Sequence, residues 1–128
     1  MLINKLTTQN DVLGVALSAS LARNDVITQN IAHADTPGYK AKRLDFEASL
    51  KTALQGYNVA TKEGLNLRNV VANVRLHNPS FNYRLDENNV DMDIEMVDLY
   101  QNSVRYDTMV NCVQMNSKRL SLVLSGRS

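Results

Sequence analysis

The stretch "NIAHADTPGYKAKRLDF" covers residues 30–46 and decides how the chain is organised. A periodic apolar pattern ends within it, because Pro37 disfavours the α-helical conformation for Thr36. Pro37 and Gly38 suit the two central positions of a type II turn, in which glycine accepts a positive φ. The stretch therefore predicts that a long helix ends near Asp35 and that the chain then changes direction sharply.

The segment before this turn predicts a helix from about Thr8 or Asn10 to Ala34. Its heptad positions alternate spacings of four and three residues: Leu13, Leu17, Ser20, Asn24, Ile27, Ile31 and Ala34. This spacing is typical of a coiled-coil seam, here with two polar members that can fix the register. An ordinary amphipathic helix packed on its own domain is the alternative reading of the same pattern.

The segment from about Asn89 to Leu124 carries the longest periodic pattern of the chain. The same alternation runs through Met92, Met96, Leu99, Ser103, Tyr106, Val110, Val113, Ser117, Leu120 and Leu124. It extends over more than four heptads, which favours a coiled-coil seam. Val97, Tyr100 and Val104 form a second apolar stripe, so we expect this helix to have more than one packing partner.

The residues between the two long patterns predict smaller elements. A short helix is expected from Asp45, as its cap, to Gly56, and the alternating runs 70–76 and 81–85 predict a β-hairpin. The chain thus divides into an N-terminal helix (1–36), a middle segment (37–88) and a C-terminal helix (89–128). We expect a mainly α, elongated fold in which the terminal helices pair as a coiled coil. Little else could cover both helices, so packing between many copies is expected.

Composition and motifs give no sign of catalytic chemistry. The 128 residues suit one domain, and the net charge of +1 favours neither nucleic acid nor a membrane surface. No run approaches the ~20 apolar residues of a membrane span, and no cleaved signal peptide is recognisable. His33, His77 and the single Cys112 form no metal-ligand or triad pattern. We therefore expect no catalytic residue, cofactor, metal, small-molecule substrate or nucleic acid partner.

Two sequence stretches resemble the bacterial flagellar rod and hook proteins. The stretch "RNDVITQNIAHADTPGYKAKRLDF" (23–46) is similar to the family's N-terminal signature, with His33 where asparagine is usual. Its core here is Asn30, Ile31, Ala32, His33, Ala34, Asp35, Thr36, Pro37, Gly38 and Tyr39. The stretch "NNVDMDIEMVDLYQNSVRYDTMV" (88–110) resembles the start of the family's C-terminal helix. Because the chain is short and lacks a large inserted domain, it is most similar to proximal-rod members.

The resemblance implies a structural subunit of the bacterial flagellar basal-body rod, located in the periplasm. Such subunits are exported through the flagellar type III apparatus without a cleaved signal peptide. The implied partners are other rod subunits, copies of the chain itself, and the rotor-ring and export-gate adaptor proteins. Thr36, Pro37 and Gly38 would set the exit from the inner helical layer.

The basic residues after the turn have two readings. Tyr39, Lys40, Lys42 and Arg43 would contact adjacent subunits or the rotor ring, or the three cations would simply form a solvated loop. Two other functions stay open at this point. One is another short rod component, and the other is a cytosolic coiled-coil adaptor or regulator, from which dependence on flagellar export would distinguish the rod protein.

Overall fold

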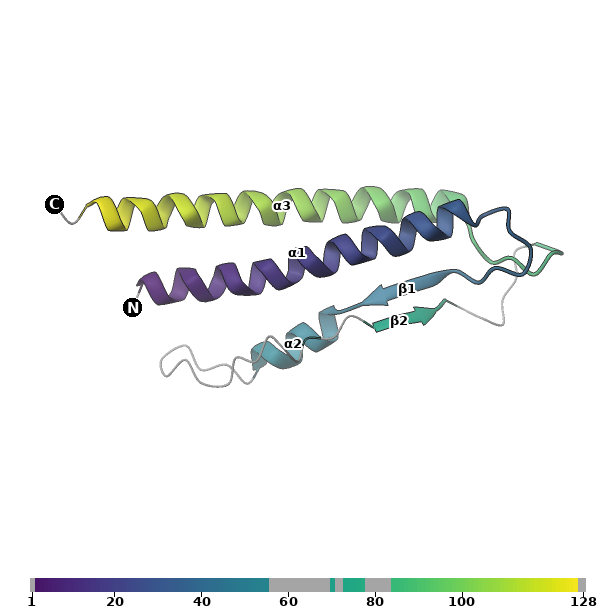
Figure 1. Cartoon of the computed structure of the whole chain (residues 1–128), viewed down its shortest axis with the longest axis horizontal. Coiled ribbons are helices and arrows are strands. Elements are labelled where there is room, and N and C mark those ends of the chain that lie inside the picture. The colour runs from purple at the N-terminus through teal and green to yellow at the C-terminus, as the bar shows by residue number, and fades with distance from the viewer. Residues whose placement is uncertain (1, 56–69, 71–72, 78–83, 127–128) are drawn as a thin grey trace.

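The computed structural model describes residues 2–55, 70, 73–77 and 84–126. Its elements are α1 (Leu2–Ala32), β1 (Lys42–Asp45), α2 (Glu47–Gln55), β2 (Asn73–Leu76) and α3 (Met92–Ser125). α1 and α3 run antiparallel along the length of the molecule, and both chain termini lie at the same end (Figure 1). β1, β2 and α2 lie along the opposite side of α1 from α3 (Figure 1). The expected mainly helical, elongated fold with paired terminal helices is confirmed.

α1 begins earlier than the sequence pattern predicts, at Leu2 instead of Thr8 or Asn10. In these early turns the Thr7 and Thr8 hydroxyls donate to carbonyl oxygens four residues earlier, each at 2.9 Å, as helical geometry allows. Leu6 is buried, which anchors this first part of the helix.

The turn after α1 has the geometry that its residues favour. Gly38 has a φ of 71°, and the Tyr39 N–H donates to the Thr36 carbonyl oxygen at 3.3 Å. These are the positive φ and the closing hydrogen bond of a type II turn.

α3 has a well-defined cap at its start. The Asp91 carboxylate accepts hydrogen bonds from the backbone N–H groups of Asp93 and Ile94, at 3.0 and 3.3 Å. These bonds satisfy N–H groups that have no partner inside the helix, so α3 begins at Met92.

The sheet of the middle segment differs from the predicted hairpin. β2 pairs antiparallel with β1, with Leu76 opposite Lys42 and Asn73 opposite Asp45. The predicted partner run, 81–85, lies partly outside the described residues. Asp45 is therefore a strand residue, bound to Arg75 at 2.6 Å, and not the cap of α2. Sequence alternation predicted a strand over 70–76, and β2 lies within that run, but alternation could not reveal a partner on the far side of α2.

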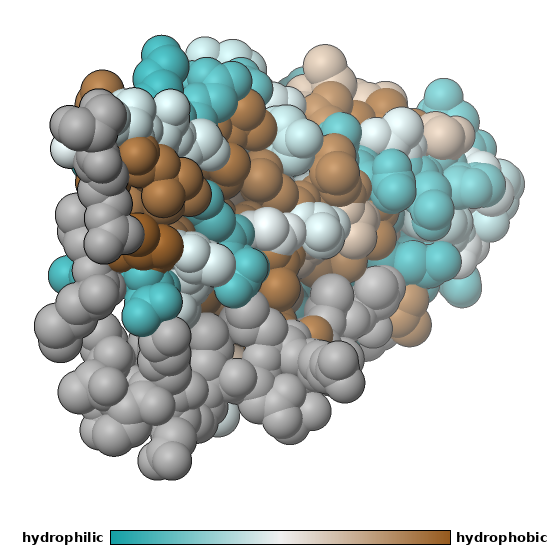
Figure 2. All heavy atoms as spheres, turned by 60° about the vertical axis from the view of Figure 1, so that its left-hand side comes forward, coloured by the Kyte–Doolittle hydropathy of each residue, from teal (hydrophilic) through white to brown (hydrophobic). Residues whose placement is uncertain are grey.

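The apolar core is small and lies between α1, β1 and the start of α2. Its buried members are Ala16, Ala19, Val26, Leu44 and Phe46, with Leu50 and Met109 packed at its edge. Alanines at the contact let the elements approach closely. Many large apolar side chains of α3 stay exposed, namely Met92, Ile94, Met96, Val97, Tyr100, Val104, Met115, Leu122 and Leu124. Figure 2 shows hydrophobic side chains running along the visible surface among polar ones.

Within the part of the chain that the structure describes, no helix has the length and apolar character needed to cross a membrane.

Candidate assembly site at the junction of α1, β1 and α3

Asn30, in the last turns of α1, is the centre of a polar network at one end of the helical pair. Its side chain is fully buried. Its Oδ1 accepts from the Lys42 N–H at 2.9 Å and from the Tyr39 hydroxyl at 3.3 Å. Its Nδ2 donates to the Lys42 carbonyl at 2.8 Å and to Glu95 Oε2 at 3.1 Å. One amide thus joins α1 to the backbone of β1 and to a carboxylate of α3.

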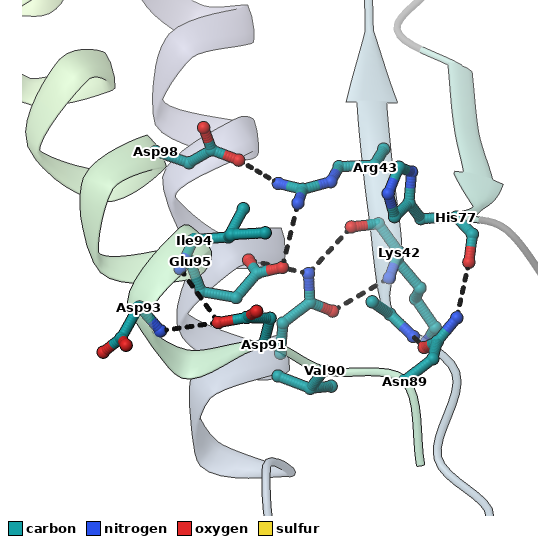
Figure 3. A network of polar contacts seen from close by, with 12 residues as sticks. Lys42, Arg43, His77, Asn89, Val90, Asp91, Asp93, Ile94, Glu95 and Asp98 are labelled. Carbon is teal, nitrogen blue, oxygen red and sulfur yellow. Dashed lines mark hydrogen bonds and ion pairs between the residues drawn. The ribbon is translucent and has the colours of Figure 1, made fainter. Parts of the chain in front are cut away.

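Arg43 completes the link between β1 and α3. Figure 3 shows its guanidinium reaching from β1 to the carboxylates of Glu95 and Asp98. The Arg43 Nη2–Glu95 Oε1 distance is 3.2 Å. Glu95 is only 1% exposed, and this burial raises the pKa of its carboxyl, while Asn30 and Arg43 oppose the shift. A buried charge of this kind depends on its partners, so these residues stabilise the junction as a unit.

Two buried asparagines before α3 hold the end of α1 and the turn. Asn88 Nδ2 donates to the carbonyl oxygens of His33, Ala34 and Thr36, at 3.0, 3.0 and 2.8 Å. These bonds join the segment before α3 to the backbone at the end of α1 and in the turn. Asn88 Oδ1 also accepts from the Val90 N–H at 2.7 Å.

Asn89, just before α3, hydrogen-bonds to residues next to both strands. Its Oδ1 accepts from the Ala41 N–H at 2.6 Å, and its Nδ2 donates to the His77 carbonyl at 2.7 Å (Figure 3). We use the name junction clasp for Asn30, Arg43, Asn88, Asn89 and Glu95.

Along the rest of the α1–α3 contact, polar pairs recur between the helices. Ser20 Oγ donates to Asn102 Oδ1, and Asn102 Nδ2 donates back to the Ser20 carbonyl, both at 2.9 Å. Nearer the termini, Asn116 Nδ2 donates to Asn10 Oδ1 at 3.2 Å. Buried polar residues in a helical seam fix register at a cost in stability, so these pairs favour one alignment of α1 against α3.

The structure places the predicted heptad residues at different depths. Ser20 and Ile27 of α1 and Ala34, just after it, are buried, and Leu13, Leu17, Asn24 and Ile31 are half-buried. On α3, Leu99, Tyr106, Val110, Val113 and Leu120 are half-buried, whereas Met92, Met96, Ser103, Ser117 and Leu124 are exposed. The positions that α3 buries are Glu95, Asn102 and Asn116. Each of these buried residues lies one position before a predicted heptad residue (Met96, Ser103 and Ser117). That the exposed heptad positions form a seam between subunits stays a prediction.

The signature residues surround the turn. Asn30 and Ala34 are buried, Ile31 and Tyr39 are half-buried, and Ala32, Thr36, Pro37 and Gly38 are exposed. The His33 ring, at the one unusual position, stacks on Tyr39 with 4.6 Å between ring centroids. Burial, and then the charge of Glu95, raise the pKa of the Tyr39 hydroxyl.

The three basic residues after the turn are not equivalent. Arg43 is held inside the chain by Glu95 and Asp98. Lys40 Nζ donates to the Glu87 carbonyl at 2.6 Å. The Lys42 ammonium makes no ion pair with the described residues, and it lines a pocket of about 420 Å³ together with Arg105. Of the three, Lys42 is therefore best placed to meet another molecule.

Sequence reasoning missed the junction residues Asn88, Asn89 and Glu95 as a functional group. The two asparagines stand in the stretch that resembles the family's C-terminal segment, and this was the available signal. Among the described residues, no group of three or more His, Cys, Asp or Glu side chains is placed to hold a metal. The arrangement suits holding backbone segments together.

Comparison with known proteins identifies the family. A family model described as "Flagella basal body rod protein" matches residues 11–40, which include most of α1 and the turn. Flagellar basal body rod protein FlgB of Bacillus subtilis (strain 168) is 32% identical over 94% of this chain and 94% of its own length. FlgB of Cereibacter sphaeroides is 32% identical over 94% and 99%, and FlgB of Escherichia coli (strain K12) over 85% and 87%. The chain belongs to the FlgB family.

As a member of the FlgB family, the chain is a structural protein of the flagellar basal body rod. The matches cover 85–94% of the chain, so they include the junction clasp and parts of both long helices. Membership does not favour the alternative of a cytosolic adaptor.

Proposed function

We propose that this chain is a non-catalytic structural subunit of the proximal rod, which transmits torque from the rotor to the hook. The observation that carries the proposal is FlgB family membership together with a fold of two long antiparallel helices. The junction clasp supports a mechanical role, because it ties the exit of α1 to both β1 and α3 through buried hydrogen bonds. A shaft needs subunits whose elements do not slide past one another.

The exposed surface of α3 supports assembly. Met92, Met96, Val97, Tyr100 and Val104 are all more than two-fifths exposed on one helix. Burial of such side chains contributes roughly 1.5–3 kcal/mol each when it is complete. We propose that other rod subunits and further copies of this chain cover them, and that rotor-ring and export-gate adaptor proteins contact the assembly. Export would occur without a cleaved signal peptide.

Mass spectrometry of purified hook–basal bodies tests this proposal. The chain should be present at several copies per particle, and a deletion strain should lose swimming and regain it on complementation. Abundance in the cytosol combined with absence from the particles would contradict the rod function. Intact chain mass in the particles, counted from the first residue, tests the absence of cleavage.

Charge reversal separates the basic residues after the turn. Lys42→Glu should reduce swimming and incorporation into basal bodies while leaving the thermal unfolding of the purified chain nearly unchanged, because the ammonium has no ion-pair partner in the described chain. Lys51→Glu, on the exposed side of α2, is the matched control. Normal motility with Lys42→Glu would exclude an essential contact there.

A further inference from the structure

A second groove between α1 and α3 lies away from the small sheet. It contains a pocket of about 210 Å³ lined by Leu21 and Asn24 of α1 and by Ser103, Tyr106 and Asp107 of α3. The opposite groove is lined partly by Phe46 and Glu47, so β1 and α2 already occupy that side. The pocket is therefore on the open side of the helical pair.

Two polar side-chain groups that line this pocket have no partner among the described residues. Asn24 Oδ1 is buried and makes no hydrogen bond, the one such side-chain atom among the described residues. A buried acceptor without a hydrogen bond destabilises the fold. The exposed Asp107 carboxylate makes no hydrogen bond or ion pair with the described chain. A cationic donor that enters the pocket could pair with Asp107, and a donor that reaches Asn24 Oδ1 would supply its missing hydrogen bond.

The chain itself carries a surface that matches this pocket. Met115, Lys118 and Leu122 are spaced by three and four residues, so they share one face of α3 near its C-terminal end. Met115 is 51% exposed, Leu122 is 71% exposed, and Lys118 is exposed between them. The stripe has an apolar side chain on each side of Lys118. The pocket has Leu21, which is 51% exposed, together with the Asp107 carboxylate and the side-chain carbonyl of Asn24.

We propose that the C-terminal end of α3 from a second copy docks in this pocket, with its Lys118 facing Asn24 and Asp107. This proposal rests on the rod function proposed above. Within one chain the contact cannot form, because Lys118 lies eleven residues beyond Asp107 on the same straight helix, about 16 Å along its axis. Two different surfaces meet, so the contact is heterologous, and each copy can both offer its α3 end and receive that of a neighbour.

Site-directed cross-linking in assembled basal bodies tests the contact. In a Cys112→Ser background, cells express one tagged copy with Leu21→Cys and a second, differently tagged copy with Leu122→Cys. The expected product is a mixed dimer that contains both tags. Gln29→Cys, exposed on α1 outside the pocket lining, is the matched control and should give no mixed dimer with Leu122→Cys.

The outcomes separate this proposal from the rod function. Basal bodies that contain both copies but give no mixed dimer, or give only Leu21–Leu21 dimers, would overturn the docking contact and leave the rod function standing. Absence of the chain from basal bodies would overturn the rod function first.

Charge exchange gives a second test. Asp107→Lys and Lys118→Asp should each lower the mixed cross-link roughly 2- to 5-fold, as expected for one partly exposed ion pair. A chain with both changes should recover most of the yield, because the two charges face each other again. Equal loss in the double variant would contradict the pairing.

Asn24→Leu separates a docking role from a purely structural one. Removing an unsatisfied buried acceptor should raise the thermal midpoint of the purified chain. The same change should lower the mixed cross-link yield, because the donor from the second copy loses its partner. Higher stability with unchanged cross-linking would mean that Asn24 takes no part in the contact.

Discussion

The two ends of the α1–α3 pair are built differently. At the junction end, Asn30, Asn88 and Asn89 bond backbone groups of β1, of the turn after α1 and of residues next to the two strands, and Asn30 also bonds the Glu95 side chain. At the end where the termini lie, the described side chains of the two helices are joined by the Asn10–Asn116 bond, while Leu122 and Leu124 stay exposed. The comparison indicates that polar contacts between the elements are concentrated at the junction end, whereas apolar side chains of α3 are left exposed at both ends.

Loss of the Asn30 amide should produce the largest effect on the isolated chain. Asn30→Ala leaves the Lys42 N–H without its partner and the buried Glu95 carboxylate with Arg43 as its remaining partner among the described residues. We expect a decrease of about 2–4 kcal/mol in the free energy of unfolding, which urea titration followed by circular dichroism would measure.

Asn10→Ala is the matched control at the other end. It removes one bond of 3.2 Å and gains helix propensity, so the change should be below about 1 kcal/mol. Similar losses for the two variants would contradict the difference between the ends.

Two glycines sharpen the comparison through effects of opposite sign. Gly38 has a φ of 71°, so Gly38→Ala should cost about 1 kcal/mol or somewhat more. Gly14 lies within α1, and an added Cβ there would meet no atom within 4 Å. Gly14→Ala should therefore stabilise the chain by about 0.5–1 kcal/mol. Thermal unfolding of both variants against wild type would measure the two shifts, and a loss of stability in Gly14→Ala would show an unrecognised contact.

The sequence contained enough information for the long helices and the turn. Heptad spacing and the Pro37-Gly38 pair act locally, so they could be recognised without knowledge of the fold. The pairing of β1 with β2 could not, because its partners are separated by α2 and by more than twenty residues. Sequence patterns favour pairing a strand with the next alternating run along the chain. The pairing of β2 with the distant β1 has no periodic signal in the sequence.

The face of α3 toward α1 was hard to predict for a different reason. Heptad analysis seeks apolar positions, and it selected Met96, although the adjacent Glu95 is the buried residue. Burial of Glu95, Asn102 and Asn116 depends on polar partners that only the folded chain brings near. The most apolar face of a subunit that assembles need not be the face that it buries within itself.

The Ser20–Asn102 pair tests whether polar contacts between the helices add stability or only select their alignment. Ser20→Ala should cost about 1 kcal/mol, because Asn102 Oδ1 loses its donor. Adding Asn102→Leu should recover most of that loss, since an apolar pair needs no hydrogen bond. Unfolding titrations give both values, and a further large loss in the double variant would show that the polar pair itself stabilises the chain.

The smallest expected effect is a pH dependence at the junction end. Burial raises the pKa of Glu95 above its ordinary value of 4.5, so the folded chain binds this proton more tightly than the unfolded chain. The contribution of Glu95 to stability is therefore greatest below that ordinary value and falls as pH rises through the raised pKa. Glu95→Gln cannot titrate, so the stability of wild type relative to this variant should decline over the same interval, measured by urea titrations at several pH values. The decline should persist in high salt, because salt screens charge–charge interactions but does not remove the cost of burial. A decline that disappears in high salt would assign the shift to the neighbouring Asp98 and Asp91 charges.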